Sequence, residues 1–292
     1  MTTFGPRRSR GAALVLVLWL IALLTALVGA FALSAQIEHL QQRVQDDTGR
    51  AEEIGRAGIA YALSRLRADA QRPPWQADGR LYRWRFDGAQ VDLRIEDESG
   101  KINLNLADAA LLAAFLRALD VAEGEATQLA GAIVDWRDAD DLSPPGGGAE
   151  AGDYAAAGLA YGPRNARMET IGELQRVLGM SPALYRQMRP MVTVHGRQAR
   201  PDARSARGPV LTALGLDAAL VLAQRQQSWS RPQDPSQPPA VATGSGTYSI
   251  ECRVTDERGR TALSRAIVRN APSQAMGRAY TVLEWEQGMA AK

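Results

Sequence analysis

The residues of this sequence with the clearest capacity for chemistry are carboxylates crowded between positions 135 and 150. The stretch also contains two prolines and a run of three glycines, and its acidic residues are Asp135, Asp138, Asp140, Asp141 and Glu150. Crowded carboxylates repel one another unless water solvates them or a cation bridges them. Ca²⁺ accepts about 6–8 oxygen ligands in an irregular geometry that a glycine-rich loop can supply. The pattern therefore predicts either a calcium site or a solvated acidic loop.

The spacing within this group differs from that of an EF-hand. If Asp138 is taken as the first ligand, Ser143 stands where an EF-hand has its glycine, and the final acidic residue falls one place late. Asp135 lies beside Trp136 on a predicted helix face, so it is either a further ligand or a residue that caps or orients the site. We expect the ligands of a bound metal to be Asp138, Asp140, Asp141 and Glu150.

The composition offers little material for other kinds of site. The net charge is +2, from 34 basic and 32 acidic residues, so no electrostatic excess favours nucleic acid as a partner. Cys252 is the lone cysteine, which excludes an internal disulfide, and His39 and His195 are too few for an expected zinc site. Neither a Gly-x-Ser-x-Gly motif nor a Walker phosphate loop is present. We therefore expect no catalytic residues and no enzyme activity.

A second candidate site is the stretch from Ile171 to Pro190, which resembles a helix-hairpin-helix unit. Units of this kind can hold the nucleic-acid backbone with the amides of a glycine-rich hairpin. The hairpin here, Gly179-Met180-Ser181, lacks the second glycine that such phosphate cradles favour. The pattern favours structural packing, with contact to DNA as the alternative.

The element expected to position everything else is an N-terminal membrane-spanning helix. The stretch Ala12–Leu33, which includes Leu16 and Trp19, is uncharged, and at about 1.5 Å per residue it covers the ~30 Å hydrocarbon layer of a bilayer. Three arginines at positions 7–10 precede it, so the positive-inside rule predicts a single-pass inner-membrane protein with a cytoplasmic N-terminus and a periplasmic bulk. A cleaved secretory signal is the alternative, because Ala30-Phe31-Ala32 resembles a cleavage site.

The elements beyond the span divide into a sheet and a block of helices. A stripe of apolar residues at helical spacing continues the first helix to about residue 67. Alternating residues at 80–96 predict a hairpin that turns at Asp87-Gly88 and points the aromatic residues at 82, 84 and 86 into the sheet core. Helical spacing fills 105–195. Further strands are expected near 248–254, 262–269 and 280–285. The predicted fold class is α+β, with a long N-terminal transmembrane helix and a small antiparallel sheet interrupted by a large all-helical insertion.

The start of the chain resembles that of a type IV pilin-like protein, because a basic leader ends at Gly11 and apolar residues follow at once. In that family a prepilin peptidase cuts after the glycine, so the resemblance implies cleavage between Gly11 and Ala12. Major pilins and major pseudopilins carry a glutamate at the fifth mature position, where this chain has Leu16. A carboxylate buried at that depth is costly and is offset in the family by the terminal ammonium of an adjacent subunit. A subunit without it fits a place at the filament end.

Several motifs further along resemble, in order, the signature of the type II secretion protein K family. They are Glu98-Ser99-Gly100-Lys101-Ile102-Asn103-Leu104-Asn105, Ala132-Ile133-Val134-Asp135-Trp136-Arg137-Asp138, Gly148-Ala149-Glu150, Tyr154 and Arg189-Pro190-Met191-Val192-Thr193-Val194. Together with the leader they span nearly the whole chain. This family is one of minor pseudopilins, so the resemblance implies a periplasmic pilin-like α/β domain with a large helical insertion, and it implies calcium in the acidic region.

The resemblance and the patterns together suggest a division of the chain. Residues 1–11 form the basic prepilin leader, and 12–33 form the transmembrane helix, which continues as helix to about 67. The pilin-like domain takes two separate stretches, 75–104 and 206–292. The inserted helical domain, with its helix-hairpin-helix-like unit, takes 105–195, and 196–209 form a linker.

The function implied is that of a subunit that caps the tip of the periplasmic pseudopilus and helps to initiate its assembly for protein export across the outer membrane. The implied partners are other minor pseudopilins and the pseudopilus, prepilin peptidase, the inner membrane and secreted substrate proteins, with structural calcium as cofactor. Two other classes stay open. One is a membrane-anchored helix-hairpin-helix DNA-binding protein of an uptake system, and the other is a secreted enzyme released by signal cleavage near Ala32.

Overall fold

The computed structural model describes residues 10–66, 74–142, 146–230, 244–270 and 280–289, without the side chains of 10–13, 32–48 and 230. Most of the predicted leader lies outside the described residues, and at Gly11, Ala12 and Leu33 only the backbone is described. The chain separates into two compact units, 1–53 and 54–292, and each is described by itself.

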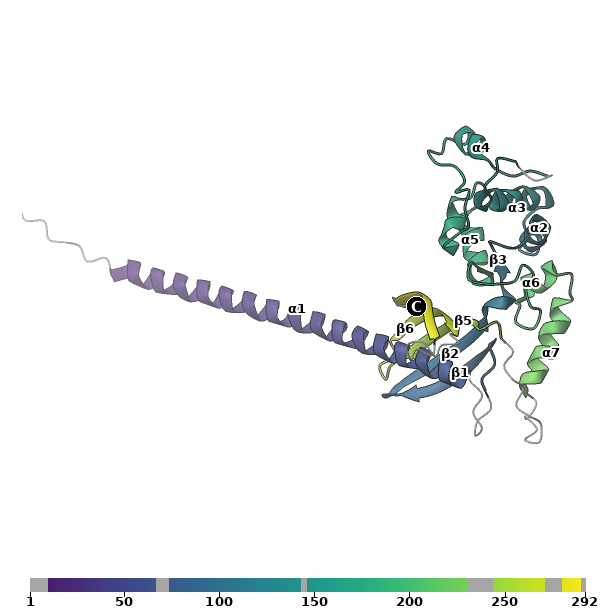
Figure 1. Cartoon of the computed structure of the whole chain (residues 1–292). Coiled ribbons are helices and arrows are strands. Elements are labelled where there is room, and N and C mark those ends of the chain that lie inside the picture. Colours follow the sequence, from purple (N-terminus) through teal and green to yellow (C-terminus); the bar gives the residue numbers. More distant parts are fainter. Residues whose placement is uncertain (1–9, 67–73, 143–145, 231–243, 271–279, 290–292) are drawn as a thin grey trace, which may run out of the picture. The chain divides into compact units, whose positions relative to one another are not determined.

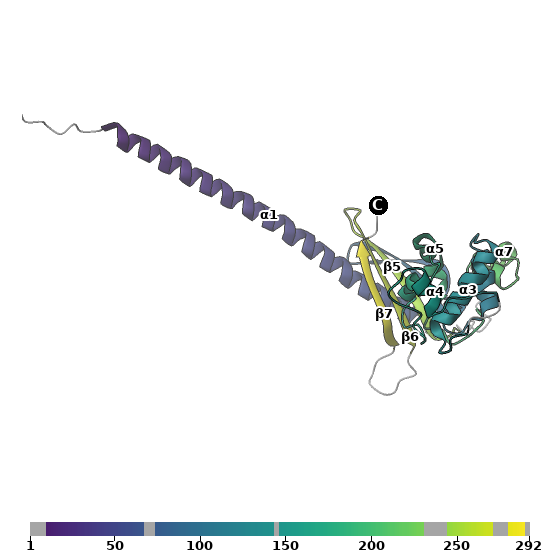
Figure 2. The same cartoon turned by 90° about the horizontal axis from the view of Figure 1, so that it is seen from above.

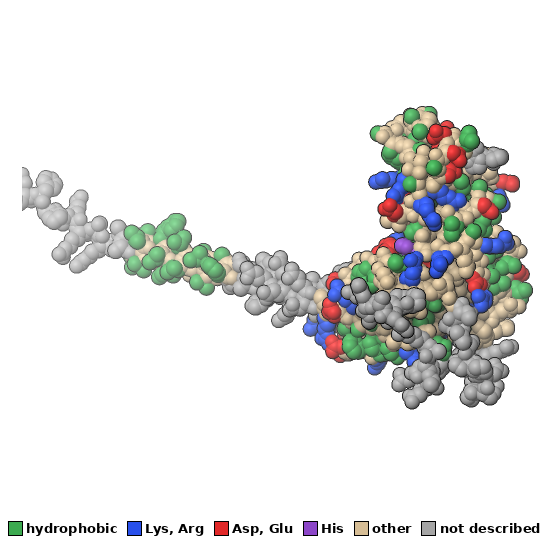
Figure 3. Space-filling model, viewed as in Figure 1, with side chains coloured by type: hydrophobic (Ala, Val, Ile, Leu, Met, Phe, Trp, Pro, Cys, Tyr) green, Lys and Arg blue, Asp and Glu red, His purple; other side chains and the backbone are tan. Residues whose placement is uncertain are grey.

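Helix α1 runs from Arg10 to Arg65. Its segment Leu14–Phe31 has a mean hydropathy of 2.8 and is 0% buried, and Figure 3 shows it as a band of hydrophobic side chains. Leu16 and Trp19, within this segment, are 69% and 71% exposed. Apolar side chains at this exposure are unfavourable in water and favourable in lipid. By length and composition the segment can cross a membrane, which fits the predicted single-pass anchor.

The second unit contains a five-stranded antiparallel sheet in the order β1-β2-β5-β6-β7 (Figure 1). Strands β1 and β2 form the predicted hairpin, which turns at Asp87 and Gly88 with φ of 51° and 77°. Positive φ at both central residues is what a type I′ turn requires. The strand bounds are β1 Asp78–Phe86, β2 Ala89–Asp97, β5 Thr247–Thr255, β6 Thr261–Asn270 and β7 Tyr280–Met289. The predicted α+β fold class is confirmed.

The last turns of α1 pack against one face of this sheet. Their contact is close because α1 presents glycines there: a Cβ added at Gly58 would lie 2.8 Å from Cys252 Sγ, and one at Gly55 would lie 2.7 Å from Ser264 Oγ. The sheet supplies the packing partner that this glycine-weakened helix needs. The core between them includes Ile54, Ile59, Ala62, Leu63, Val91, Leu93, Ile95, Ile250, Cys252, Val254, Ala266 and Val268.

The aromatic residues of β1 only partly meet the expectation of a core position. Trp84 stacks on Tyr61 of α1 with ring centroids 4.5 Å apart, and Tyr82 stacks on Trp75 at 4.1 Å. Phe86 stacks on Trp84 but stays 43% exposed. The reason is that β1 is an edge strand, so Phe86 has a neighbouring strand, β2, on one side only.

The remaining helices gather into a second hydrophobic core, shown as one group in Figure 2. We call this part, residues 102–230, the helical lobe. Its α-helices are α2 Ala109–Arg117, α3 Glu123–Arg137, α4 Ala151–Ala156, α5 Pro182–Met188, α6 Gly208–Ala213 and α7 Ala218–Ser230. Short 3₁₀ helices occur at η1 Glu98–Gly100, η2 Ile171–Arg176 and η3 Arg189–Met191.

The predicted boundaries of the insertion need correction at both ends. Ile102 and Leu104, assigned to the pilin-like part, have fully buried side chains in the core of the lobe, and so do Val210 and Leu211 of α6. The insertion is not wholly helical either, since β3 Ile102–Asn103 pairs in parallel with β4 Val192–Thr193. These contacts join residues far apart in the chain, so local periodicity carries no sign of them.

The predicted linker, residues 196–209, is not a free connection. Ala206 is buried in the lobe core, and the amide of Asp202 donates to the carbonyl of Ser99 at 2.8 Å. A Cβ added at Gly100 would lie 2.5 Å from the carbonyl carbon of Ser205. Residues 202–206 therefore pack directly against the segment 99–100, which leads from β2 into the lobe.

A buried ion pair lies at this junction. Lys101 Nζ donates to the carboxylate of Glu98 and, at 2.9 Å, to Ser249 Oγ of β5. The two side chains are 5% and 0% exposed. Burial alone would raise the pKa of Glu98, but the charge of the adjacent Lys101 ammonium and the hydrogen bonds from Lys101, Thr193 and Ser249 together outweigh it, so the pKa is lowered.

Candidate metal centre

Two of the predicted acidic residues lie at the C-terminal end of α3. Asp135 is in its last turn, and Asp138 is the C-cap, where the backbone becomes extended with φ −87° and ψ 171°. Residues three apart lie on the same face of a helix. The helix end therefore points both carboxylates into the same space, which the loop that follows must close.

That loop lies directly on α3 because glycines meet there. Gly146 and Gly147 have φ of 104° and 114°, which favour glycine. A Cβ added at Gly131, in the middle of α3, would lie 1.9 Å from the carbonyl oxygen of Gly147. The amide of Ala149 then donates to Asp135 Oδ2 at 2.7 Å, which brings Glu150 beside the helix end.

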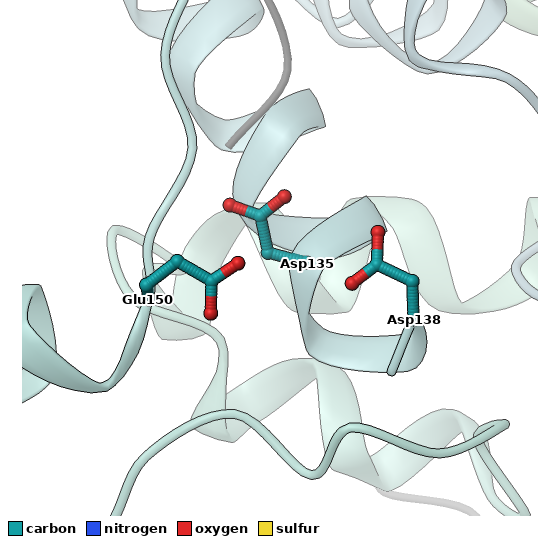
Figure 4. A group of neighbouring side chains, drawn as sticks. All are labelled: Asp135, Asp138 and Glu150. Atoms are coloured by element: carbon teal, nitrogen blue, oxygen red, sulfur yellow. The ribbon is translucent and has the colours of Figure 1, made fainter. Parts of the chain in front are cut away.

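Asp135, Asp138 and Glu150 each place a carboxylate oxygen within 4.8 Å of the others. Figure 4 shows the three carboxylates directed toward a common space. Asp135 is fully buried, and the other two are half-buried. Both carboxylate oxygens of Glu150 and Oδ1 of Asp138 are shielded from solvent and have no hydrogen-bond donor among the described residues. Buried acceptors without donors are unfavourable unless a cation or water satisfies them.

The electrostatics of the group agree with its crowding. The pKa of Asp138 is raised by burial and then by the charges of Asp140 and Asp135. The pKa of Glu150 is raised by burial and by the charge of Asp135, with smaller effects from the other carboxylates. Each group thus disfavours the charge of its neighbours, and a bound cation would relieve that repulsion.

The structure brings together only part of the predicted ligand set. Asp138 and Glu150 are in the group, and Asp135, whose role was left open, both joins it and orients the loop through Ala149. Asp140 and Asp141 lie outside it in the described structure. Asp140 instead accepts a hydrogen bond from the amide of Leu142 at 2.9 Å and is exposed. Beyond the end of α3, the local turn of the backbone determines which way each side chain points. The spacing of the acidic residues alone does not predict that turn.

The donors present fit a hard cation such as Ca²⁺. All are carboxylate oxygens, with no nitrogen or sulfur in the group, and hard divalent cations prefer oxygen. Glu150 and Asp138 retain oxygens that no described donor satisfies. Asp135, Asp138 and Glu150 are thus the residues that would hold calcium, with water or backbone carbonyls completing the coordination.

Glu173 forms a hydrogen bond with Trp136, which lies next to this group in α3. It was not among the site residues predicted from the sequence. Its Oε2 accepts from Trp136 Nε1 at 3.3 Å, and its Oε1 accepts from Arg164 Nη1 at 2.8 Å. The same Oε1 accepts from the amides of Glu169 and Thr170 at 2.8 and 3.1 Å. The only sequence signal is a capping-box spacing, Thr170 with Glu173 three residues on, and it is a signal of helix capping alone.

A surface hollow of about 540 Å³ opens next to Glu173. Trp136 and Tyr161 form aromatic parts of its lining, and Arg164, Glu169, Glu173 and Arg176 supply its charges. Tyr161 packs on Tyr154, whose ring lies 6.1 Å from that of Trp136. The hollow and the carboxylate group therefore both lie at the C-terminal end of α3.

The helix-hairpin-helix-like stretch forms η2 and α5, joined by a turn in which Gly179 has φ 86°. Leu174, Leu184 and Met188 point into the lobe core. These side chains give the unit a packing role, in line with the favoured interpretation. The first element is a six-residue 3₁₀ helix, so the likeness to the DNA-binding unit is only approximate.

The chain is similar to known proteins of type II secretion systems. Residues 93–197 match the family described as type II secretion system (T2SS), protein K. The type II secretion system protein K of Pectobacterium carotovorum subsp. carotovorum is 29% identical over 210 residues, covering 63% of this chain and 62% of that protein. The protein of the same name from Pseudomonas aeruginosa is 27% identical over 229 residues, covering 71% and 68%. The match therefore spans about 62–68% of the length of these relatives.

The fold is similar to a solved structure. A chain of the crystal structure of the GspK-GspI-GspJ complex from the enterotoxigenic Escherichia coli type 2 secretion system matches with a TM-score of 0.59 and 19% identity. The match covers 86% of this chain and 100% of the other. At that identity the likeness concerns the fold.

Proposed function

We propose a function from the premise that this chain belongs to the type II secretion system protein K family. The protein is a minor pseudopilin that caps the tip of the periplasmic pseudopilus and helps to initiate its assembly for export of proteins across the outer membrane. It acts by assembly with other minor pseudopilins and catalyses no reaction. A similar solved chain was crystallised in a complex with GspI and GspJ, which supports partners of this kind.

The proposal rests on the point at which the helical lobe is inserted between two strands of the sheet. The lobe is inserted between β2 and β5, which are neighbouring strands with Leu93 opposite Cys252. It has its own hydrophobic core and is tied to the sheet by Glu98 and Lys101. A rigid insertion of this size would obstruct the axial stacking of another subunit upon it, so the chain fits the end of a filament.

Labelling of the lobe tests the tip position. Ala156→Cys places a thiol on the exposed surface of α4. The native Cys252 does not compete, because it is buried and burial raises its pKa to about 12. Gold-maleimide on assembled pseudopili should appear at one end of each filament by electron microscopy. Label at regular intervals along the shaft would refute the tip position.

The membrane part of the proposal rests on the apolar exposed segment of α1. The protein is anchored in the inner membrane with a cytoplasmic N-terminus, and prepilin peptidase removes the leader between Gly11 and Ala12. N-terminal sequencing of the protein from membranes should return a chain that starts at Ala12. A start near Leu33 would instead indicate a secreted protein released by signal cleavage.

Calcium is part of the proposal as a structural ion. Asp135, Asp138 and Glu150 hold it, and it ties the loop at 146–150 to the end of α3. Added Ca²⁺ should raise the melting temperature of the detergent-solubilised chain, as expected for any ligand that binds only the native state. A melting temperature that does not change across a calcium titration would contradict the site.

A further inference from the structure

We propose that Glu173 is a positioning residue for the carboxylate group, acting through Trp136 without touching the ion. This inference rests on the calcium proposal above and deepens it. It concerns which side chain outside the three carboxylates sets the affinity of the site.

Trp136 is the residue through which Glu173 acts. It lies in α3 between Asp135 and Asp138, so any rotation of this helix end moves both carboxylates. Its side chain is 3% exposed, and its ring packs beside that of Tyr154, which lies in α4, the helix whose N-cap is Glu150. All three carboxylates therefore belong to short segments attached to this aromatic pair.

Glu173 fixes the position of the Trp136 indole ring. The indole N–H donates to Oε2 of Glu173, whose side chain is only 13% exposed. Glu173 cannot move freely, since Arg164 and the amides of Glu169 and Thr170 all donate to Oε1. The Glu173 carboxylate thus links the loop at 164–170 to the end of α3 through hydrogen bonds that hold it in place.

The two carboxylate oxygens of Glu173 accept different numbers of hydrogen bonds. Three donors converge on Oε1 and one on Oε2, so a glutamine at this position would turn its oxygen toward the three. Its NH₂ group would then face the indole N–H of Trp136, a donor against a donor. Glu173→Gln should therefore preserve the loop and break the link to Trp136.

Calcium affinity of the full chain in detergent, measured by isothermal titration calorimetry, tests the inference. Groups that orient ligands directly change metal affinity by roughly 10–100-fold. Because Glu173 acts one residue further away, we expect Glu173→Gln to raise the calcium dissociation constant by about three- to tenfold. The matched control is Glu169→Gln, because Glu169 pairs with the same Arg164 at 2.6 Å but is 76% exposed and makes no hydrogen bond to Trp136 in the part of the chain that the structure describes. It should bind calcium as the unaltered chain does.

A second variant separates positioning from loss of stability. Trp136→Phe removes the indole donor and keeps a ring, so it should weaken calcium binding, and adding Glu173→Gln to it should cause little further loss. A merely structural role for Glu173 would lower the melting temperature equally with and without calcium. A positioning role shrinks the rise that calcium produces.

The outcomes are distinct. Unchanged calcium affinity in Glu173→Gln, or fully additive effects of the two substitutions, would overturn this inference and leave the calcium proposal intact. Absence of calcium binding in the unaltered chain would overturn both.

Discussion

At the scale of single residues, Glu98 and Lys101 show how a buried charge can hold two parts of a chain together. Both side chains are withdrawn from water at the point where the lobe leaves the sheet. Such a pair is not strongly stabilising in itself, but the removal of one partner leaves an uncompensated charge. The pair therefore makes the junction specific to one arrangement.

Lys101→Met should lower the free energy of unfolding by about 3–5 kcal/mol, because it strands the Glu98 carboxylate. Urea denaturation at neutral pH measures the loss, and Glu98→Gln in the same chain should restore part of it. Arg207→Met, which breaks the more exposed pair with Glu96 at the same junction, should cost only about 0–1 kcal/mol. Equal losses in the two variants would contradict a special role for the buried pair.

The pH dependence of the junction follows from the lowered pKa of Glu98. A carboxyl with a lowered pKa in the folded state contributes stability above its unfolded-state pKa and loses it as the pH falls through the folded value. The contribution of the pair should therefore be intact at neutral pH and vanish only in acid below the ordinary glutamate pKa of 4.5. Denaturation midpoints of the unaltered chain and the Glu98→Gln, Lys101→Met double variant should converge as the pH is lowered.

The raised pKa values of Asp138 and Glu150 have the opposite effect on stability. Their charged forms are disfavoured in the folded chain, so without a cation they destabilise it above their unfolded-state pKa. Glu150→Gln should therefore raise the melting temperature slightly in a chelator and reduce the rise that Ca²⁺ causes. Differential scanning calorimetry with and without calcium shows both effects. A lowered melting temperature in chelator would indicate that the repulsion is already relieved by water.

At the scale of elements, α3 and the loop after it are held together by a glycine contact. Gly131→Ala would drive a methyl group against the Gly147 carbonyl and push Glu150 away from the helix. We expect a loss of about 1–3 kcal/mol, as for overpacked sites, together with weaker calcium binding.

The control for this substitution lies in the same helix. A Cβ at Gly124 meets no atom within 4 Å, so Gly124→Ala should be neutral or stabilise by up to ~1 kcal/mol through helix propensity. Chemical denaturation and calorimetry on both variants give the comparison. Tolerance of Gly131→Ala with unchanged calcium affinity would mean that the loop is free to shift.

The end of α1 depends on a similar close approach to the sheet. At Gly58 a side chain would meet Cys252 and Val91, whereas at Gly49 a Cβ meets no atom within 4 Å. Gly58→Val should destabilise the second unit by about 1–3 kcal/mol through overpacking, and Gly49→Val should leave its unfolding unchanged. Thermal unfolding followed by near-ultraviolet circular dichroism distinguishes them. Equal behaviour would mean that the helix can tilt away from the sheet without cost.

At the scale of the whole molecule, the membrane anchor is expected to decide where the folded part can act. An arginine at the centre of a spanning helix costs about 2.5–3.5 kcal/mol of insertion free energy. Leu20→Arg should therefore increase the fraction of the protein released by alkaline carbonate. Leu216→Arg, at an exposed leucine of the lobe, should not. Equal extraction of the two variants would argue against the span.

Much of the architecture could be read from short patterns in the chain. The uncharged run at 12–33, the turn at Asp87-Gly88 and the alternation along β2 are local, and local periodicity determines which face of a helix or strand is apolar. The hairpin and the helix thus appear where the patterns predict them. The family motifs are short and occur in the expected sequence along the chain, so they too could be identified without any structure.

The boundaries of the lobe and the membership of the carboxylate group were decided only by tertiary contacts. Ile102 joins the lobe because it pairs with Val192, and Glu150 meets Asp135 because the Gly147 carbonyl can approach Gly131. Glu173 reaches Trp136 across 37 residues of sequence. A pattern in the chain specifies what a residue can bond to, whereas chain folding alone determines which partner lies within the few ångströms over which hydrogen bonds and packing act.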